Sequence, residues 1–512
     1  MKKATRAYIV IILLLFSFNS CSQPVRTPGS KSITVEDLKK HMEYFASDEL
    51  EGRKTGTAGY LKAAEYAAEQ FKSMGLEPGW TDEDGSKTYF QPVPFTRYIQ
   101  GKDNSITLRK NGEEEVFRIG GNNYQLQFLG PFGKEKLEGK PVFIGYGIHE
   151  PEYEWDDFKG LDIDGKIVIM MAGAPVKKNG NRILPNDVHN KYADREKGEI
   201  NKLPYLIEKK PGGVIFIGSQ EMMRYWDIIK NNRKRFDFEP DESYINEDLP
   251  AESPYPVIIA HQDFVRKIFT DFGFDPVTKE GNYRTFEFEN LEIRLSIDYK
   301  KEKFTSPNVI GILRGSNEEL KDEYITAGAH LDHLGREGNI IYNGANDNAT
   351  GSTVILEIAE AAVMNPPARP VIFILYTAEE AGHIGSRHFL KYPPVPRENI
   401  KLNINVEQIG SKTRNVRHFW AVGAPELREP LYKANEKTIN ARIEYSNTES
   451  MLDAFRGSDN YSYYRLGIPA MVIGTGFPEH HTPRDNLDII DYDYLYKGTK
   501  LVYAYLIELG NR

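Results

Sequence analysis

Cysteine is nearly absent from this sequence, because Cys21 is the only one among 512 residues. A single thiol excludes a disulfide within the chain. Cys21 also lies close to the N-terminus, so the rest of the chain offers no thiolate as a metal ligand or nucleophile. Any metal site must therefore be built from His, Asp and Glu side chains.

Long basic runs are absent too. The 65 Lys and Arg residues are outnumbered by 74 Asp and Glu residues, which gives a formal net charge of -9. Because binding to nucleic acid through a surface requires clustered positive charge, we expect no nucleic-acid partner. Low-complexity stretches and repeats of fixed period are not evident. A chain of this length predicts two to four domains.

One apolar run stands at the N-terminus. Residues 8–16 follow Lys2, Lys3 and Arg6 and are too few to cross a membrane comfortably, which is typical of an export signal. Cys21 comes directly after this run. The stretch resembles a bacterial lipoprotein signal, in which that cysteine becomes the lipidated first residue of the mature chain. The alternative is an incidental cysteine near a signal peptide.

We therefore predict a signal peptide over residues 1–21 and a polar tether over residues 22–33. The resemblance implies export and a lipid anchor in a bacterial cell-envelope membrane, on its periplasmic or surface face. The sequence does not determine the oligomeric state.

The pattern of helix and strand signals changes twice along the rest of the chain. Residues 34–95 show two helical patterns, residues 96–300 are rich in strands and turns, and residues 301–512 alternate strands with helices. The alternation predicts an α/β fold with a mostly parallel central sheet flanked by helices. Strands are expected near 308–313, 324–329, 371–377, 401–406, 417–422 and 469–474, and helices near 351–364, 384–391, 425–438, 459–466 and 491–509.

Polar side chains follow these strands at the points where they end. The positions are His330, Asp347, the pair Glu379 and Glu380, Glu407 and His481. Because ligands of parallel sheets bind outside the carboxyl ends of the strands, we expect these side chains to meet at one rim. Imidazole and carboxylate groups suit zinc, and a further carboxylate not bound to metal can accept a proton from water.

Each of these positions taken alone has a plainer explanation. An acidic pair such as Glu379 and Glu380 is usually a solvated helix start, and Asp347 is compatible with a residue at a helix N-terminus. The isolated His149, His189 and His261 of the middle region have no such ordered neighbours. The ordered occurrence of polar residues after successive strands is what favours a site.

The same segments resemble the M28 family of zinc peptidases. The resemblance is carried by residues 329–332, 344–351, 379–386 and 481–485, and the opening segment 47–57 is similar as well. The stretch 142–172 resembles a protease-associated (PA) domain. The resemblance implies a catalytic domain made of residues 34–95 and 301–512, with a β-rich PA-like insert over 96–300.

Carried over residue by residue, the resemblance implies two zinc ions. His330, Asp347 and Glu407 would bind one ion, and Asp347, Glu380 and His481 the other, with Asp347 as the bridge. Glu379 would be the general base and acid. Asp332 would hold the ring of His330 in the correct tautomer.

Three positions leave alternatives open. The family usually has Asp where this chain has Glu407, so a single-metal enzyme is conceivable. Asn460 stands where the family often has His, and the neighbouring Asp459 is a second candidate for the surroundings of the site. His480 is the substitute for His481 as a ligand.

The function implied is an exopeptidase with peptide substrates, and an aminopeptidase more than a carboxypeptidase. Two other functions fit the same scaffold. One is a glutaminyl cyclase with a single zinc, and the other is a non-catalytic binding protein.

Overall fold

The fold is described from a computed structural model of the chain. It describes residues 29–127, 134–177, 179–194, 198–224, 226–227, 237–241, 255–281, 283–411, 418–446 and 449–512. The predicted signal peptide and residues 22–28 of the predicted tether lie outside the described residues. Within the described ranges, no helix combines the length and the apolar character needed to cross a membrane.

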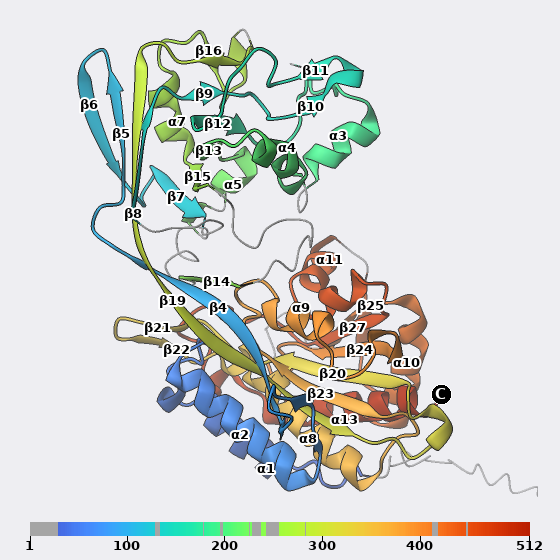
Figure 1. Cartoon of the computed structure of the whole chain (residues 1–512). Helices are drawn as coiled ribbons and strands as arrows, with labels where there is room; N and C mark the ends of the chain where they lie inside the picture. Colours follow the sequence, from blue (N-terminus) through green and yellow to red (C-terminus); the bar gives the residue numbers. More distant parts are fainter. Residues whose placement is uncertain are drawn as a thin grey trace, which may run out of the picture.

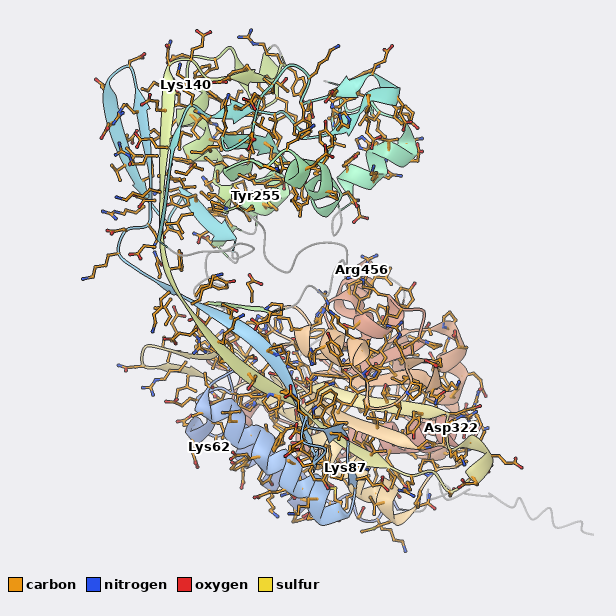
Figure 2. The ribbon with its side chains drawn as sticks, viewed as in Figure 1. Lys62, Lys87, Lys140, Tyr255, Asp322 and Arg456 are labelled. Atoms are coloured by element: carbon orange, nitrogen blue, oxygen red, sulfur yellow. The ribbon has the colours of Figure 1, made fainter. Side chains whose placement is uncertain are left out.

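The molecule has two parts, each with its own hydrophobic core (Figure 1). We call residues 29–95 and 301–512 the main domain and residues 96–300 the insert. Two long neighbouring strands, β4 (Phe90–Gln100) and β19 (Leu291–Leu313), run from one part into the other. In Figure 2, Tyr255 lies on the side of the insert that faces the main domain, and Arg456 lies on the opposing side of the main domain.

The main sheet has the strand order β14-β4-β19-β23-β20-β24-β27-β25-β26. Its four central strands, β23, β20, β24 and β27, are mutually parallel, whereas β19 and β25 pair antiparallel to them. The predicted α/β class is confirmed, and the parallel part is the centre of a mixed sheet. The further strands are β14 (Phe238–Pro240), β20 (Tyr324–His330), β23 (Val371–Tyr376), β24 (Ile400–Val406), β25 (Phe419–Gly423), β26 (Ile443–Tyr445) and β27 (Ala470–Gly474).

Helices cover both faces of this sheet, which explains why β23 and β27 are unbroken apolar runs. All six residues of β23 are buried, and alternate residues contact opposite faces. One face packs against α1 (Val35–Phe45), α2 (Ala58–Met74), α8 (Thr350–Met364), α10 (Arg428–Lys437) and α13 (Tyr492–Gly510). The other face packs against α9 (Ile384–Lys391) and α12 (Asn460–Tyr464), and α11 (Glu449–Arg456) contacts α12.

Local sequence signals set the ends of the first two helices. Thr34 caps α1 by accepting a hydrogen bond from the backbone N–H of Asp37, and Thr57 caps α2 in the same way through Tyr60. Helix α2 ends at Gly75, whose φ of 83° is the left-handed conformation that glycine adopts most easily. These ends place the loop between the two helices, residues 46–57, beside the main sheet.

Strand β19 departs from the prediction. The sequence predicts separate strands near residues 291–297 and 308–313, but the structure has one strand of 23 residues. The polar stretch between them is held in the extended form because Tyr299 to Val309 pair along β4 from Gln100 to Phe90. The predicted domain boundaries at residues 95/96 and 300/301 therefore fall inside two paired strands.

The insert is built on a sheet of order β18-β9-β12-β13-β15-β7 beside a second group of strands along β19. Residues 105–110 and 113–118 form a hairpin, with Asn111 and Gly112 both at positive φ in its turn. Its helices are α3 (Asn186–Ala193), α4 (Leu203–Glu208), α5 (Gln220–Arg224) and α7 (Gln262–Phe269). Its strands are β5 (Ser105–Lys110), β6 (Glu113–Arg118), β7 (Tyr124–Gln127), β8 (Lys134–Gly139), β9 (Val142–Phe143), β12 (Ile167–Met171), β13 (Gly213–Ile217), β15 (Val257–Ala260) and β18 (Phe286–Glu287). The PA-like identity of the insert stays a prediction.

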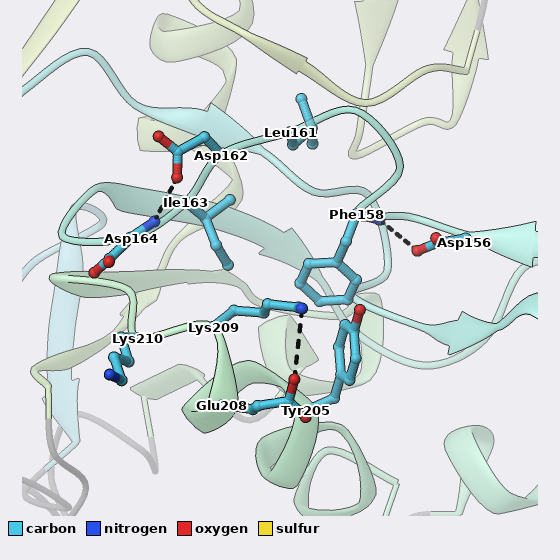
Figure 3. Close-up of a pocket in the computed structure, with 10 residues that line it drawn as sticks. All are labelled: Asp156, Phe158, Leu161, Asp162, Ile163, Asp164, Tyr205, Glu208, Lys209 and Lys210. Carbon is cyan, nitrogen blue, oxygen red and sulfur yellow. Dashed lines mark hydrogen bonds and ion pairs between the residues drawn. The ribbon is translucent and has the colours of Figure 1, made fainter.

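A cavity of about 350 Å³ opens in the insert (Figure 3). Phe158 and Tyr205 line it in an edge-on contact with ring centroids 4.8 Å apart, and Lys209 pairs with Glu208 at its edge. None of the predicted site residues lines this cavity.

Candidate metal centre

The parallel strands of the main domain deliver the predicted polar residues to one edge of the sheet. His330 is the last residue of β20, and Glu379 and Glu407 follow the ends of β23 and β24. Asp347 lies in the turn before α8, and His481 lies in the loop after β27. The structure therefore brings all the predicted ligands together.

His330 lies at the centre of one group. Its Nε2 atom is 3.1 Å from Oε1 of Glu407 and 3.3 Å from Oδ1 of Asp347. The same nitrogen is 3.9 Å from Oε2 of Glu379. The extra methylene of Glu407, compared with Asp, therefore does not keep its carboxylate from the cluster.

A second group forms on the other oxygen of Asp347. Nε2 of His481 is 2.9 Å from Oε2 of Glu380 and 3.4 Å from Oδ2 of Asp347. His480 also reaches this carboxylate, with Nδ1 3.0 Å from Oδ2. Both His480 and His481 thus approach Asp347, and both are candidate ligands.

One histidine of the cluster was not expected from the sequence. His333 places Nδ1 2.7 Å from Oε1 of Glu380 and 3.9 Å from Oδ2 of Asp347. Its side chain is completely buried. The signal was present in the sequence, because His333 follows the same strand end as His330, but a second histidine three residues on is not specific by itself.

The turn that holds Asp347 is fixed by a neighbouring carboxylate. Asp485 accepts hydrogen bonds from the backbone N–H groups of Asn346 (2.7 Å) and Asp347 (3.0 Å). Asn348 donates to the carbonyl of Val406 at the end of β24 and accepts from the N–H of Gln408. The bridge position is therefore tied to the end of β24 and to the loop after β27, which carries Asp485.

Asp332 supports the site through different atoms from those predicted. Nδ1 of His330 is 3.0 Å from the backbone carbonyl of Asp332, while its carboxylate lies 3.9 Å away. That carboxylate instead accepts from the backbone N–H of Glu379 (3.0 Å) and from the hydroxyl of Thr55 (3.1 Å). The carbonyl therefore fixes the ring of His330, and the carboxylate positions Glu379.

Glu407 and Glu379 each have one more side-chain neighbour. Ser458 donates a hydrogen bond of 2.6 Å to Oε2 of Glu407, which leaves Oε1 facing His330. Nε2 of His383 lies 3.3 Å from Oε1 of Glu379. Glu379 belongs to none of the groups of candidate metal ligands that the described residues form around Asp347. Its carboxylate lies beside these groups.

Arg53, in the segment 47–57, is a buried cation behind the cluster, and the sequence alone assigned it no role. Its side chain donates hydrogen bonds to the backbone carbonyls of Phe45, Leu331, Asn343 and Gly344. These carbonyls belong to helix α1 and to the segments that carry His330 and Asp347. Arg53 therefore joins the loop between α1 and α2 to the segments on both sides of the ligands.

Burial and neighbouring charges shift the acidic groups of the site in opposite directions. Burial, together with the charges of Glu380 and Glu407, raises the pKa of Glu379 well above its usual range. Burial opposes ionisation of Glu380 as well, but the positive charges of His481 and His333 outweigh it and lower that pKa. Burial raises the pKa of Asp459, which lies near Glu407, to about 7.

These groups fit a metal centre by their donor chemistry and geometry. Oδ2 of Asp347 is buried and takes part in no hydrogen bond, although imidazole nitrogens surround it. In the part of the chain that the structure describes, three groups of His, Asp and Glu bring their ligand atoms within 4.8 Å of one another, and each contains Asp347: His330, Asp347 and Glu407; His333, Asp347 and Glu380; Asp347, His480 and His481. A carboxylate shared in this way is what two neighbouring divalent ions require.

Comparison with known proteins agrees with this geometry. Residues 308–506, which carry all of these ligands, match Peptidase family M28. This segment is an M28 peptidase domain. The remaining residues of the main domain, α1, α2 and the loop between them, pack onto the M28 domain and supply Arg53 and Thr55.

Two curated relatives of the M28 domain are named as aminopeptidases. Aminopeptidase YwaD of Bacillus subtilis is 27% identical over 215 residues, which cover 40% of this chain and 45% of that protein. A probable leucine aminopeptidase of Trichophyton verrucosum is 27% identical over 303 residues, covering 51% of this chain and 80% of that protein. The chain thus spans slightly less than half of the first relative and most of the second.

The fold extends beyond the M28 domain. The structure of an aminopeptidase from Aneurinibacillus sp. strain AM-1 aligns with 94% of this chain and 95% of its own, with a TM-score of 0.56 and 17% sequence identity. A similarity at this identity establishes the fold alone. It covers the main domain and the insert together.

Proposed function

We propose that the chain is a zinc-dependent aminopeptidase that removes residues from the N-terminus of peptides. The observation that carries this proposal is the sharing of Asp347 by ligand groups on either side of it, with Glu379 beside them. The M28 domain and the aminopeptidase names of two relatives support it.

Two zinc ions are proposed. His330, Asp347 and Glu407 would hold one, and Asp347, Glu380 and His481 the other, with His480 as the alternative imidazole. When bound, the ions would polarise the peptide carbonyl and lower the pKa of water.

Side chains of the protein transfer the proton and orient the groups that take part. Glu379 takes the proton of the attacking water and passes it to the leaving amine. Asp332 holds the backbone of Glu379, and His383 lies against one of its carboxylate oxygens, so the base is oriented from two sides. Ser458 keeps Glu407 turned toward His330.

The substrates proposed are short peptides with a free N-terminus. The insert is joined to the main domain by β4 and β19, and by β14, which pairs with β4. It adds a second folded part on one side of the M28 domain, and we propose that it restricts the approach of long or folded chains.

The test is a scan of aminoacyl substrates and peptides, with and without a chelator. An aminopeptidase releases N-terminal residues, ignores peptides with a blocked N-terminus and stops when zinc is removed. Release of C-terminal residues from blocked peptides would reverse the assigned direction. Formation of pyroglutamate without peptide cleavage would identify a glutaminyl cyclase, and a purified protein without bound zinc would favour a binding protein.

We also propose that the chain is exported and anchored through a lipid on Cys21. The support is the order of basic residues, apolar run and cysteine in the first 21 residues. Membrane fractionation of wild type and Cys21→Ser tests this. The wild type should be recovered with membranes and the variant in the soluble fraction, and equal distribution of the two would contradict the anchor.

A further inference from the structure

The metal centre contains more imidazoles than the ligand set carried over from the family uses. Four histidines, His330, His333, His480 and His481, approach Asp347. We propose that His333 is a metal ligand through Nδ1, together with Asp347, Glu380 and His481. This inference rests on the two-zinc centre proposed above and adds a fourth protein ligand to one of its positions.

The position of His333 matches that role. Nδ1 faces Glu380 at 2.7 Å and belongs to a group of three ligand atoms, with Asp347 and Glu380, that lie within 4.8 Å of one another. The Nε2 atom on the far side of the ring is buried and takes part in no hydrogen bond. The nitrogen directed at the carboxylates is thus the only one of the two with a hydrogen-bond partner in the described structure.

The ring of His333 has little freedom to turn away. A Cβ atom on Gly344 would lie 2.5 Å from Cγ and Cδ2 of His333, so glycine at this position allows the ring to pack against the backbone. The backbone N–H of His333 donates to the carbonyl of Arg53 (3.3 Å), and Arg53 in turn donates to the carbonyl of Gly344 (3.0 Å). The same loop therefore holds both the histidine and the glycine that faces it.

His333 and His480 differ as additional ligands. The His480 side chain is 44% exposed, and Gln408 approaches the same Nδ1 atom that faces Asp347, at 3.2 Å. His333 is completely buried, and among the described residues the polar contacts of its Nδ1 are with the carboxylates of Glu380 and Asp347. The buried imidazole loses less conformational entropy on binding a metal, because it is already fixed.

The consequence is an asymmetric pair of metal positions. One would have one imidazole and two carboxylates from His330, Asp347 and Glu407. The other would have two imidazoles and two carboxylates from His333, His481, Asp347 and Glu380. More ligands, and nitrogen ligands in particular, favour retention of zinc at the second position.

The alternative is that His333 only donates a hydrogen bond to Glu380 and orients it. X-ray absorption at zinc separates the two roles without any variant. With one equivalent of zinc loaded into the metal-free protein, the proposal predicts two imidazoles on the ion, whereas a single imidazole would overturn it. Absence of zinc binding by the wild type would instead refute the proposed function as a whole.

Zinc release to a graded chelator provides the second measurement. The wild type should release its two ions in separate steps. His333→Gln should release the more tightly held ion at a chelator concentration lowered by more than the roughly 10- to 100-fold that loss of a merely orienting residue causes. The control is His189→Gln, which changes a buried histidine of the insert and should release zinc as the wild type does.

The zinc release of His333→Gln can be interpreted only if the variant folds, so thermal unfolding of the metal-free variant is measured alongside. Unchanged release of the second ion from a folded variant would overturn the proposal. If that variant does not fold, His481→Gln is used in its place. The proposal predicts that it keeps a second zinc ion bound by His333, and loss of this ion with no imidazole besides His330 detected would overturn the proposal.

Discussion

The main domain and the insert both contain parallel strands that are fully buried, yet in the part of the chain that the structure describes only the main domain gathers ligands. In the insert, His149 pairs with Asp156 (3.0 Å) and His261 with Asp263 (3.4 Å), at separate places. In the main domain, four histidines surround the single carboxylate of Asp347. A parallel sheet therefore provides an edge where groups can meet, and the residues just beyond the strand ends decide whether they do.

The two parts also differ in how they compensate charge. Many charged side chains of the insert form exposed ion pairs, such as those of Arg109 with Glu114 and Arg294 with Glu138. In the main domain, carboxylates are buried in a group with imidazoles and with Arg53 behind them. Buried like charges are costly unless a cation joins them. The buried carboxylates of the main domain are therefore suited to binding a metal ion, whereas the exposed ion pairs of the insert compensate their own charges.

The largest expected effect follows from replacing the free carboxylate. Glu379→Gln keeps the shape of the side chain but cannot accept a proton, so kcat should fall by about 10²- to 10⁴-fold. Zinc content should stay at the wild-type level because Glu379 is outside the three ligand groups. Steady-state kinetics together with metal analysis checks both. Full activity in the variant would remove Glu379 from its role, and loss of zinc would make it a ligand.

The next effect concerns Arg53, the buried cation behind the ligand cluster of the main domain. Arg53→Met removes the side-chain donor from the buried carbonyl groups of Phe45 and Leu331, so unfolding should become easier by about 3 kcal/mol or more. Denaturant unfolding measures this. The matched control is Arg336→Met, which removes an exposed ion pair with Glu51 and should cost less than about 1 kcal/mol. Equal effects would contradict the role of Arg53.

A smaller, pH-dependent effect is expected from the buried contact between His41 and Glu357. Burial, with the charges of Asp37 and Glu360, raises the pKa of Glu357 to about 8, and burial lowers the pKa of His41 to about 4. Both groups are therefore uncharged at neutral pH, although Nε2 and Oε1 are 3.5 Å apart.

The sign of the pH dependence follows from these directions. The folded chain keeps the proton of Glu357 where the unfolded chain has lost it, so its contribution to stability falls as the pH rises from about 4.5 to 8. Between pH 6.5 and 8 His41 contributes little change, and Glu357→Gln should remove a slope of up to about 1.4 kcal/mol per pH unit. Thermal unfolding of wild type and variant at pH 6.5 and 8 tests this, and parallel curves would contradict it.

The smallest effect should come from the insert. The His149 ring stacks on Tyr205 with centroids 4.0 Å apart and its side chain is 30% exposed, so His149→Gln should cost less than about 1 kcal/mol. Zinc content and kcat/KM should stay within about twofold of wild type, since His149 belongs to none of the three ligand groups around Asp347. A tenfold loss of activity would break the contrast between the two parts.

The sequence was sufficient for the elements that carry strong periodic signals. The strands that end at His330, Tyr376, Val406 and Gly474 and helix α9 were all predicted within a few residues. Strand β26 was missed because its three residues are short and only partly buried, and they form no apolar run. The single strand β19 was missed because pairing with β4, rather than its own polar middle, keeps it extended.

The sequence predicted which residues form the site better than it predicted how their atoms are arranged. Which atom of Asp332 faces His330 depends on the turn after β20, and no spacing rule specifies that turn. Arg53 lies 278 residues before Leu331, one of its hydrogen-bond partners, so only the folded chain shows the contact. His333 was overlooked for a similar reason, since its approach to Glu380 depends on the packing of its ring against Gly344.

The pairing of β4 with β19 makes the insert a removable module. Gln100 and Tyr299, where the polypeptide leaves and re-enters, are direct partners on adjacent antiparallel strands. A tight hairpin turn can bridge such a pair, so evolution or an engineer can exchange everything between them while the peptidase scaffold keeps an unbroken chain path.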